Sequence, residues 1–352
     1  MLKCDKQTYK DLEFEKIQAL LGEYCVGPTA LRMVTHLKPV RDKDELLKFL
    51  HQTHELVQIR RVQEGIPTLD FVELTQEIKN LPIKNASLTA SSFMNIRLAS
   101  SMVNRLLYFF NKREKDYPTL YALFNSVEYT QEIITLIDAI FDRHGIVKDE
   151  ASPKLFEIRR HIESARRNVN ATFDRCIRKY LKKGYLSDTK ESFYNNRRVL
   201  AVISSYKRDV AGQILGSSNS GNVTFIEPQE TVFLNNELEQ LKDDERGEVF
   251  LILQALTKKL AAFLPLIIDY QQLLTVFDFI NAKSRLAMLL EANLPAISEE
   301  KHFDLIECYH PLLKLNNQEL KKKTVPQRIA LNSTMRMLVI SGPNAGGKST
   351  TL

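Results

Sequence analysis

Apolar residues recur at intervals of three and four positions along most of this chain, which is the spacing of one face of an α-helix. The interval is clear in residues 46–50 and again in residues 133–140. Turn-forming residues such as Gly27-Pro28 separate the helical segments. The pattern predicts that residues 1–150 form the first part of a compact helical core.

A long helix is predicted to begin at Pro153, because proline is favoured in the first helical turn and a serine precedes it as N-cap. Its apolar residues form a narrow stripe over residues 155–180, the pattern of a coiled-coil seam. Residues 154–183 carry ten lysines and arginines against three acidic residues, a net charge of +7. We assign residues 151–184 to a basic lever arm.

A second long helix with an apolar stripe is predicted after Pro228. Residues 227–248 hold eight acidic and two basic residues, a net charge of −6, and we assign residues 228–262 to an acidic return arm. Two long helices of opposite charge, separated by a short insert, predict an antiparallel coiled-coil pair. We expect the acidic arm to neutralise the basic arm, in preference to the basic arm forming a nucleic-acid-binding stripe.

Between the arms, the pattern changes to runs that are typical of β-strands. Residues 198–203 and 222–226 read as strands and residues 212–215 as a shorter one, so residues 185–227 form a small β-module at the tip of the arms. Its basic and loop residues are candidate contacts to a nucleic-acid backbone; the alternative is a solvated sheet edge whose charges prevent aggregation. The candidate nucleic-acid-binding residues are Arg197, Arg198, Lys207, Arg208, Ser217, Ser218 and Asn219.

Beyond the return arm, a helix is predicted over residues 273–290, and it places the second part of the helical core at residues 263–298. Residues 303–308 read as a strand. The His310-Pro311 pair that follows is, on its own, typical of a turn. Residues 299–352 are assigned to the start of a further domain.

A Walker A motif lies at the end of the sequence, after an apolar β-type run over residues 337–341. Its glycines allow backbone N–H groups to surround a polyphosphate, and the helix that follows adds its partial positive charge. Lys348 would stabilise the charge of the β- and γ-phosphates, and Ser349 would coordinate Mg²⁺. The predicted Mg-ATP site comprises Gly342, Pro343, Asn344, Ala345, Gly346, Gly347, Lys348, Ser349 and Thr350.

No Walker B carboxylate and no residue that orients an attacking water follow this motif in the sequence. Phosphoryl transfer needs both, so we expect the 352-residue chain alone to be inactive, with the hydrolytic residues in a later part of the protein. A purely structural helical role is also compatible with an incomplete site.

Composition narrows the class of protein only slightly. Hydrophobic residues make up 44% and charged residues 26%, as in ordinary globular domains. The net charge of +6 is compatible with a polyanionic partner without requiring one. The four cysteines are widely spaced, which indicates reduced thiols, and the absence of a long apolar segment predicts a cytoplasmic protein with no membrane partner.

The order of these segments resembles the MutS family, and within it the bacterial second-type branch. The stretches that carry this resemblance are Leu12-Glu13-Phe14, residues 149–155 and residues 220–228, and the likeness covers essentially the whole chain. It implies a mainly α fold followed by the first strands and P-loop of an ABC-type ATPase domain. It also implies that His310 and Pro311 pack against adenine, although Tyr309 replaces the arginine more usual at its position.

The resemblance implies a homodimeric ATP hydrolase that clamps branched or structured DNA and restrains homologous recombination, commonly with a C-terminal Smr nuclease domain. A second role attributed to this branch is the splitting of stalled, collided ribosomes. A third alternative is a mismatch-repair MutS-type damage sensor, but such members begin with an extra domain that bears a Phe-x-Glu wedge. Phe71-Val72-Glu73 has the same letters, but it is expected in a helical context without the surroundings of the wedge, and we interpret it as core packing.

Overall fold

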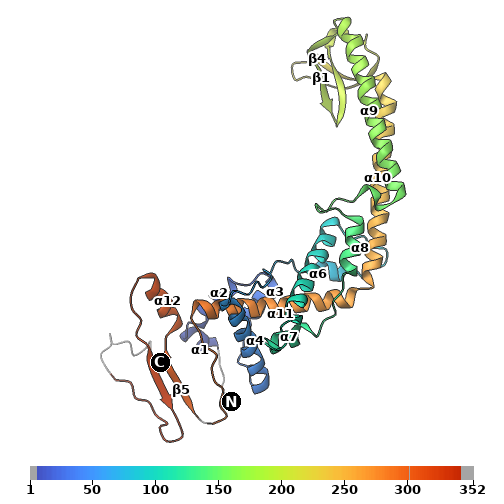
Figure 1. Ribbon diagram of the computed structural model, residues 1–352. Helices are drawn as coiled ribbons and strands as arrows, with labels where there is room; N and C mark the ends of the chain where they lie inside the picture. The colour runs from blue at the N-terminus through green and yellow to red at the C-terminus, as the bar shows by residue number, and fades with distance from the viewer. Residues whose placement is uncertain (1–5, 301, 342–352) are drawn as a thin grey trace. The chain divides into compact units, whose positions relative to one another are not determined.

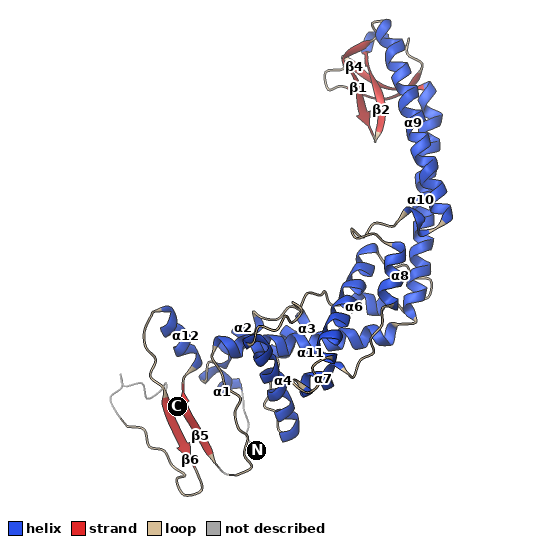
Figure 2. Cartoon of the chain, in the orientation of Figure 1, coloured by secondary structure: helices blue, strands red, loops and turns tan. Residues whose placement is uncertain are grey.

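The computed structural model describes residues 6–300 and 302–341 (Figure 1). Within these residues the chain is mainly helical and has small antiparallel sheets (Figure 2), which confirms the mainly α fold expected from the sequence. It divides into two compact units. The core unit comprises the described parts of Met1–Ile78, Asn95–Gln131 and Leu264–Leu352, and the arm unit comprises Lys79–Met94 and Glu132–Phe263.

The core unit is built around the long helix α11, which packs against α2, α3 and α4. Phe110 and Phe124 stack with ring centroids 4.4 Å apart, and Phe277 of α11 lies edge-on to both. The described helices that contribute to this unit are α1 Lys6–Asp11, α2 Phe14–Gly22, α3 Pro28–Thr35, α4 Lys43–Arg61, α5 Thr75–Asn80, α6 Ala90–Asn111, α7 Pro118–Phe124, α11 Leu264–Leu289 and α12 Pro311–Glu319. Strands β5 Phe303–Cys308 and β6 Gln327–Leu331 pair antiparallel.

A buried carboxylate holds the start of α3 in the core unit. Asp278 of α11 is fully buried and accepts hydrogen bonds from the backbone N–H groups of Val26 and Gly27, at 2.8 to 3.0 Å. Burial raises the pKa of Asp278, and the backbone hydrogen bonds oppose the rise. The N–H groups at the start of a helix have no acceptor within that helix, and the carboxylate of Asp278 supplies one here.

The segment Phe71-Val72-Glu73 lies in the same region and is packed into the core unit. Phe71 is only 5% exposed. Glu73 accepts hydrogen bonds from the backbone N–H and the hydroxyl of Thr29, at 2.5 and 2.8 Å. Phe71 and Glu73 thus confirm the interpretation as core packing, but the helical context expected for the segment is wrong, since residues 71–73 belong to neither a helix nor a strand.

In the arm unit, the long helices α9 and α10 run antiparallel to each other (Figure 1). In the sequence, the four strands of the sheet lie between them. The described elements are α8 Glu132–Ile140, the 3₁₀ helix η1 Asp149–Ala151, α9 Pro153–Lys182, β1 Leu186–Tyr194, β2 Arg197–Ile203, the 3₁₀ helix η2 Ser204–Tyr206, β3 Gly212–Ser217, β4 Val223–Pro228 and α10 Gln229–Ala261. Ser152 caps α9 by accepting a hydrogen bond from Leu155 N–H, as predicted.

Taken singly, none of the helices described in either unit is long and apolar enough to cross a membrane; only α10 and α11 counted together reach that level.

An apolar seam joins α9 to α10. Ile158, Ile162, Ala165 and Val169 of α9 are buried against Leu238 of α10. Ion pairs flank this seam, and they link Lys154 to Glu248, Arg159 to Glu245 and Lys179 to Glu230. Because the partner number falls along α10 as it rises along α9, the pairs fix the antiparallel direction.

The expected neutralisation of one arm by the other is only partial. Arg166, Arg178 and Lys182 of α9 are exposed and have no ion pair among the residues that the structure describes. Apolar side chains occupy the face of α9 that meets α10, so most of its basic residues point to solvent. Much of the positive charge of α9 therefore remains uncompensated.

The sheet of the arm unit has the strand order β1-β2-β4-β3, and every neighbouring pair is antiparallel. Its inner face packs on the second half of α9, where Phe173, Cys176 and Tyr180 are buried with Leu200 and Ile226. The sheet thus shares one apolar core with the end of the helix.

The structure differs from the sequence-based expectations at several elements. Strand β1 was missed because a bulge and polar residues interrupt its alternation. Strand β6 and helix α12 were also missed, and α11 begins at Leu264, nine residues before the predicted start, since Pro265 fits a first helical turn. The strand predicted over residues 337–341 is not formed: Met337 and Val339 are 89% and 87% exposed, and no described strand pairs with this segment.

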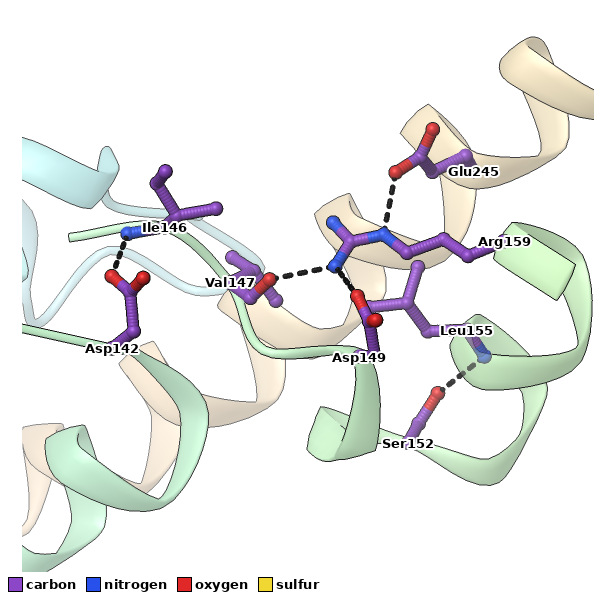
Figure 3. Close-up of polar contacts among 8 residues, drawn as sticks. All are labelled: Asp142, Ile146, Val147, Asp149, Ser152, Leu155, Arg159 and Glu245. Atoms are coloured by element: carbon purple, nitrogen blue, oxygen red, sulfur yellow. Dashed lines mark hydrogen bonds and ion pairs between the residues drawn. The ribbon is translucent and has the colours of Figure 1, made fainter. Parts of the chain in front are cut away.

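Arg159 ties the start of α9 to α10 and to the preceding loop (Figure 3). Its guanidinium donates to Glu245 at 2.7 Å, to the carbonyl of Val147 at 2.8 Å and to Asp149 at 2.5 Å. Burial alone would lower the pKa of Arg159, but the hydrogen bonds to Asp149 and Glu245 outweigh it and raise the pKa. One side chain therefore satisfies groups from two helices and a loop.

We expect Arg159→Ala to lower the opening free energy of α9 and α10 by about 1.5–3 kcal/mol, because charged hydrogen-bond partners lose their donor. Hydrogen exchange of the amides in both helices measures this quantity. Arg166→Ala is the matched control and should change it by less than about 0.5 kcal/mol. Equal effects of the two substitutions would contradict the role given to Arg159.

Candidate nucleotide and nucleic-acid sites

A cavity of about 750 Å³ lies in the core unit, beside the start of α12. Strands β5 and β6, helix α12 and the segment between α1 and α2 supply its walls. The side chains that line it include Leu12, Glu13, Lys16, Tyr309, His310 and Leu313. The cavity therefore brings the Leu12-Glu13 segment to the His310 region, nearly three hundred residues later in the chain.

His310 is the N-cap of α12, and Pro311 occupies the first helical turn. The imidazole Nδ1 accepts a hydrogen bond from the backbone N–H of Leu313 at 3.3 Å. In a neutral ring that accepts through Nδ1, the proton resides on Nε2. The His-Pro pair thus begins a helix, where the sequence alone had suggested a turn, and it leaves an N–H donor on the far side of the ring.

Charged groups border the same cavity. Lys16 forms an ion pair with Glu13 at 2.5 Å, and the hydrogen bond and charge of Lys16 lower the pKa of Glu13. Lys314 lies 5.0 Å from the ring centroid of Tyr309 and also pairs with Glu291 at 2.6 Å. Tyr309 lines the cavity, and Lys314 lies outside the cavity wall, so this cation–π contact comes from beyond the cavity. The cavity combines aliphatic, aromatic and imidazole groups that suit a flat heteroaromatic ring.

Residues 342–350, which include Lys348, Ser349 and Thr350, lie outside the described residues. Among the residues that are described, no group of three or more His, Cys, Asp or Glu side chains could hold a metal ion. The assignment of ATP and Mg²⁺ to the Walker A motif therefore stays a prediction.

The first predicted nucleic-acid contact, Arg197, is bound within the arm unit. Its Nη1 donates to both carboxylate oxygens of Glu227, at 3.0 and 3.2 Å, and its Nη2 donates to Asn236 at 2.9 Å. Glu227 is fully buried and also accepts from the Asn235 amide at 2.6 Å. The guanidinium of Arg197 thus compensates a buried negative charge.

Arg198 is bound in a similar way on the other face of β2. Its guanidinium donates to Glu191 at 2.7 and 2.9 Å and pairs with Asp174 of α9 at 2.9 Å. It also lies over the ring of Phe173, 4.4 Å from the centroid. The side chain therefore joins β1, β2 and α9, and its charge is shared with two carboxylates.

Lys207 and Arg208 are exposed, and neither has an ion pair within the described part of the chain. They lie ten and eleven positions after Arg197, beyond the other end of β2. The six steps from Arg197 to Ile203 alone span roughly 20 Å at the rise of a strand. Ser204 links the loop of Lys207 and Arg208 to the loop between β3 and β4. Its N–H donates to the carbonyl of Asn222, and its hydroxyl donates to the carbonyl of Gly221.

This junction links the two loops that carry five of the seven predicted nucleic-acid-binding residues. Asn219 and Ser217 are exposed, while Ser218 is half-buried and accepts from Val223 N–H at 3.1 Å. We name this surface the tip loops, and it comprises Lys207, Arg208, Ser217, Ser218 and Asn219. Arg197 and Arg198 are not part of it. Sequence reasoning could not separate the two groups, because their partners are distant in the chain.

Comparison with known proteins identifies relatives along the whole chain. No family model matches it. Proteins named Endonuclease MutS2 are similar: identity is 31% for that of Leuconostoc citreum, 30% for that of Enterococcus faecalis and 29% for that of Aquifex aeolicus. The matches cover 97–99% of this chain but only 43–44% of the relatives. The chain therefore spans less than half the length of the curated relatives it matches.

We expect Arg197→Ala to lower the opening free energy of the sheet by about 3–5 kcal/mol, because it leaves the buried carboxylate of Glu227 unpaired. Hydrogen exchange of the β2 and β4 amides measures the loss. Adding Glu227→Gln should restore part of it by removing the charge. Lys207→Ala, the control, should change it by less than about 0.5 kcal/mol; a loss as large as that of Arg197→Ala would contradict this assignment.

Proposed function

Because this chain belongs to the second-type branch of the MutS family, we propose that it is part of an ATP-dependent protein that clamps branched or structured DNA. The similarity to Endonuclease MutS2 proteins along 99% of the chain carries the proposal. We assign ATP hydrolysis, and the strand cleavage named in these relatives, to the complete protein. The proposed biological role is the restraint of homologous recombination.

For the nucleotide, we propose that the cavity beside α12 holds the adenine. Leu12 and Leu313 supply apolar contacts, and His310 offers its Nε2–H to a ring nitrogen. The Walker A residues 342–349 would hold the phosphates, with Lys348 on the β- and γ-phosphates and Ser349 on Mg²⁺. Bound Mg-ATP would supply the free energy for conformational change.

For the nucleic acid, we propose that α9 and α10 act as a coiled-coil arm that presents the tip loops to the phosphate backbone. Lys207 and Arg208 have no competing carboxylate among the described ion pairs, whereas Arg197 and Arg198 do. An arm from each subunit of a homodimer would close around the substrate. Contacts of this kind position a backbone and do not read its bases.

In the complete homodimer, Lys207→Ala/Arg208→Ala should weaken binding to a four-way DNA junction and reduce the log–log salt slope by about 0.9 for each lost phosphate contact. Titrations across salt concentration measure both values. The control is Lys258→Ala/Lys259→Ala, which removes an exposed pair of the same charge from the end of α10. An unchanged affinity and slope would contradict the clamp.

The same variants distinguish the translational alternative. Binding to collided ribosomes is measured in parallel with junction binding. If Lys207→Ala/Arg208→Ala loses ribosome binding and keeps junction binding, the ribosome is the partner of the tip loops and the DNA proposal is wrong.

Lys348→Ala in the complete protein should lower ATP turnover by about 10²–10³-fold, because a charge that stabilises the transferring phosphate is lost. Phosphate release, measured with and without junction DNA, tests this. Lys323→Ala removes a lysine outside the motif and should leave turnover unchanged. Wild-type turnover in Lys348→Ala would show that the motif does not serve hydrolysis.

A further inference from the structure

Three tyrosine rings form a stack that runs from the core of the arm unit to its surface. The Tyr180 and Tyr185 centroids are 6.4 Å apart at 27°, and those of Tyr185 and Tyr206 are 4.8 Å apart at 17°. Tyr180 is buried, Tyr185 is half-buried and Tyr206 is 39% exposed. The stack therefore ends in an aromatic ring that is open to solvent.

The inner rings have structural roles that the outer ring lacks. Tyr180 belongs to the apolar cluster under the sheet, and its hydroxyl accepts a hydrogen bond from Ala211 N–H at 3.3 Å. Tyr185 packs against the same cluster. Tyr206 is neither a member of this cluster nor packed against it. Within the described part of the chain, its ring contacts the ring of Tyr185. Core packing thus explains Tyr180 and Tyr185 but not an exposed tyrosine at the end of the stack.

Cations lie beside the tyrosine stack and next to Tyr206 in the sequence. Lys183 lies 5.7 Å from the centroid of Tyr185 and 5.9 Å from that of Tyr180. Lys207 and Arg208 follow Tyr206 directly in the sequence, and Asp209 comes next. Within the described residues, Lys183, Lys207 and Arg208 have no ion pair. Proteins hold unpaired nucleotides by combining basic residues with an exposed aromatic ring, and the outer end of this stack has both.

We propose that Tyr206 is a stacking platform for an unpaired nucleobase, with Lys183, Lys207 and Arg208 placed for the flanking phosphates. A base that is stacked in a duplex has both faces covered, so only a base that has left the stack can extend the tyrosine column. This deepens the proposed function and rests on it: the substrate class becomes nucleic acid with an unpaired base next to a paired region. A branched DNA and a ribosomal RNA loop both have this chemistry.

The test uses the complete homodimer and two DNA junctions that differ by one unpaired 2-aminopurine at the branch. Wild type should bind the junction with the unpaired base about tenfold more tightly and quench its fluorescence, as expected for stacking on an aromatic ring. Tyr206→Leu should lose this preference and the quenching, and it should retain the affinity for the fully paired junction and its salt slope. Tyr206→Phe keeps the ring and should behave as wild type.

Two results would overturn the stacking platform. One is wild-type binding without quenching, which needs no variant and does not depend on how Tyr206→Leu folds. The other is an equal loss of affinity by Tyr206→Leu for both junctions. Failure of the proposed clamp has a different signature, since Lys207→Ala/Arg208→Ala would then leave all junction binding unchanged. An RNA hairpin with 2-aminopurine in its loop distinguishes DNA from RNA as the source of the unpaired base. If Tyr206→Leu lowers the affinity for the hairpin more than the affinity for the junction, the platform is supported with RNA as its ligand.

Discussion

The buried carboxylate of Glu227 is the interaction on which the arm unit depends. It lies one residue before the end of β4, and it is fully removed from water. Burying a charge is costly unless hydrogen bonds and an opposite charge compensate it, and Arg197 and Asn235 do so here. Because Arg197 begins β2 and Asn235 belongs to α10, this compensation fixes the sheet on the helix. Gly212 of β3 packs against the backbone of Glu227 so closely that a Cβ atom would lie 2.2 Å from its carbonyl oxygen.

The sequence was sufficient for elements whose stability is local or periodic. The serine cap predicted the start of α9 at Pro153, and the apolar stripe over residues 155–180 lies within this helix. The apolar run at residues 198–203 predicted β2. It was insufficient where pairing decides the structure. Strand β1 is polar and bulged, and it is a strand because β2 pairs with it. The run over residues 337–341 has the composition of a strand, but it has no partner among the described residues.

The candidate sites show the same division. A motif of contiguous residues, such as Walker A, can be recognised from its letters alone. The cavity beside α12 could not be predicted from periodicity, because Leu12 and His310 meet only through the tertiary fold. Charge placed Arg197, Arg198, Lys207 and Arg208 in one candidate nucleic-acid-binding set, and the structure divides this set by the partners of each side chain. Arg197 looks equivalent to Lys207 in sequence, and only the carboxylate thirty residues later distinguishes a structural arginine from a free cation.

The uneven compensation of charge between α9 and α10 has a consequence for orientation. Solvent-facing arginines and lysines lie on one helix, while α10 carries an acidic excess along its first half. The helical pair therefore has a transverse electric dipole, with a positive and a negative side. The field of a nearby polyanion exerts a torque on this dipole that turns the α9 side toward the polyanion. Salt screens the field beyond about 8 Å at physiological ionic strength. A polyanion that approaches from the α10 side meets the acidic excess and is repelled, so the electrostatic interaction depends on the direction of approach before any contact forms.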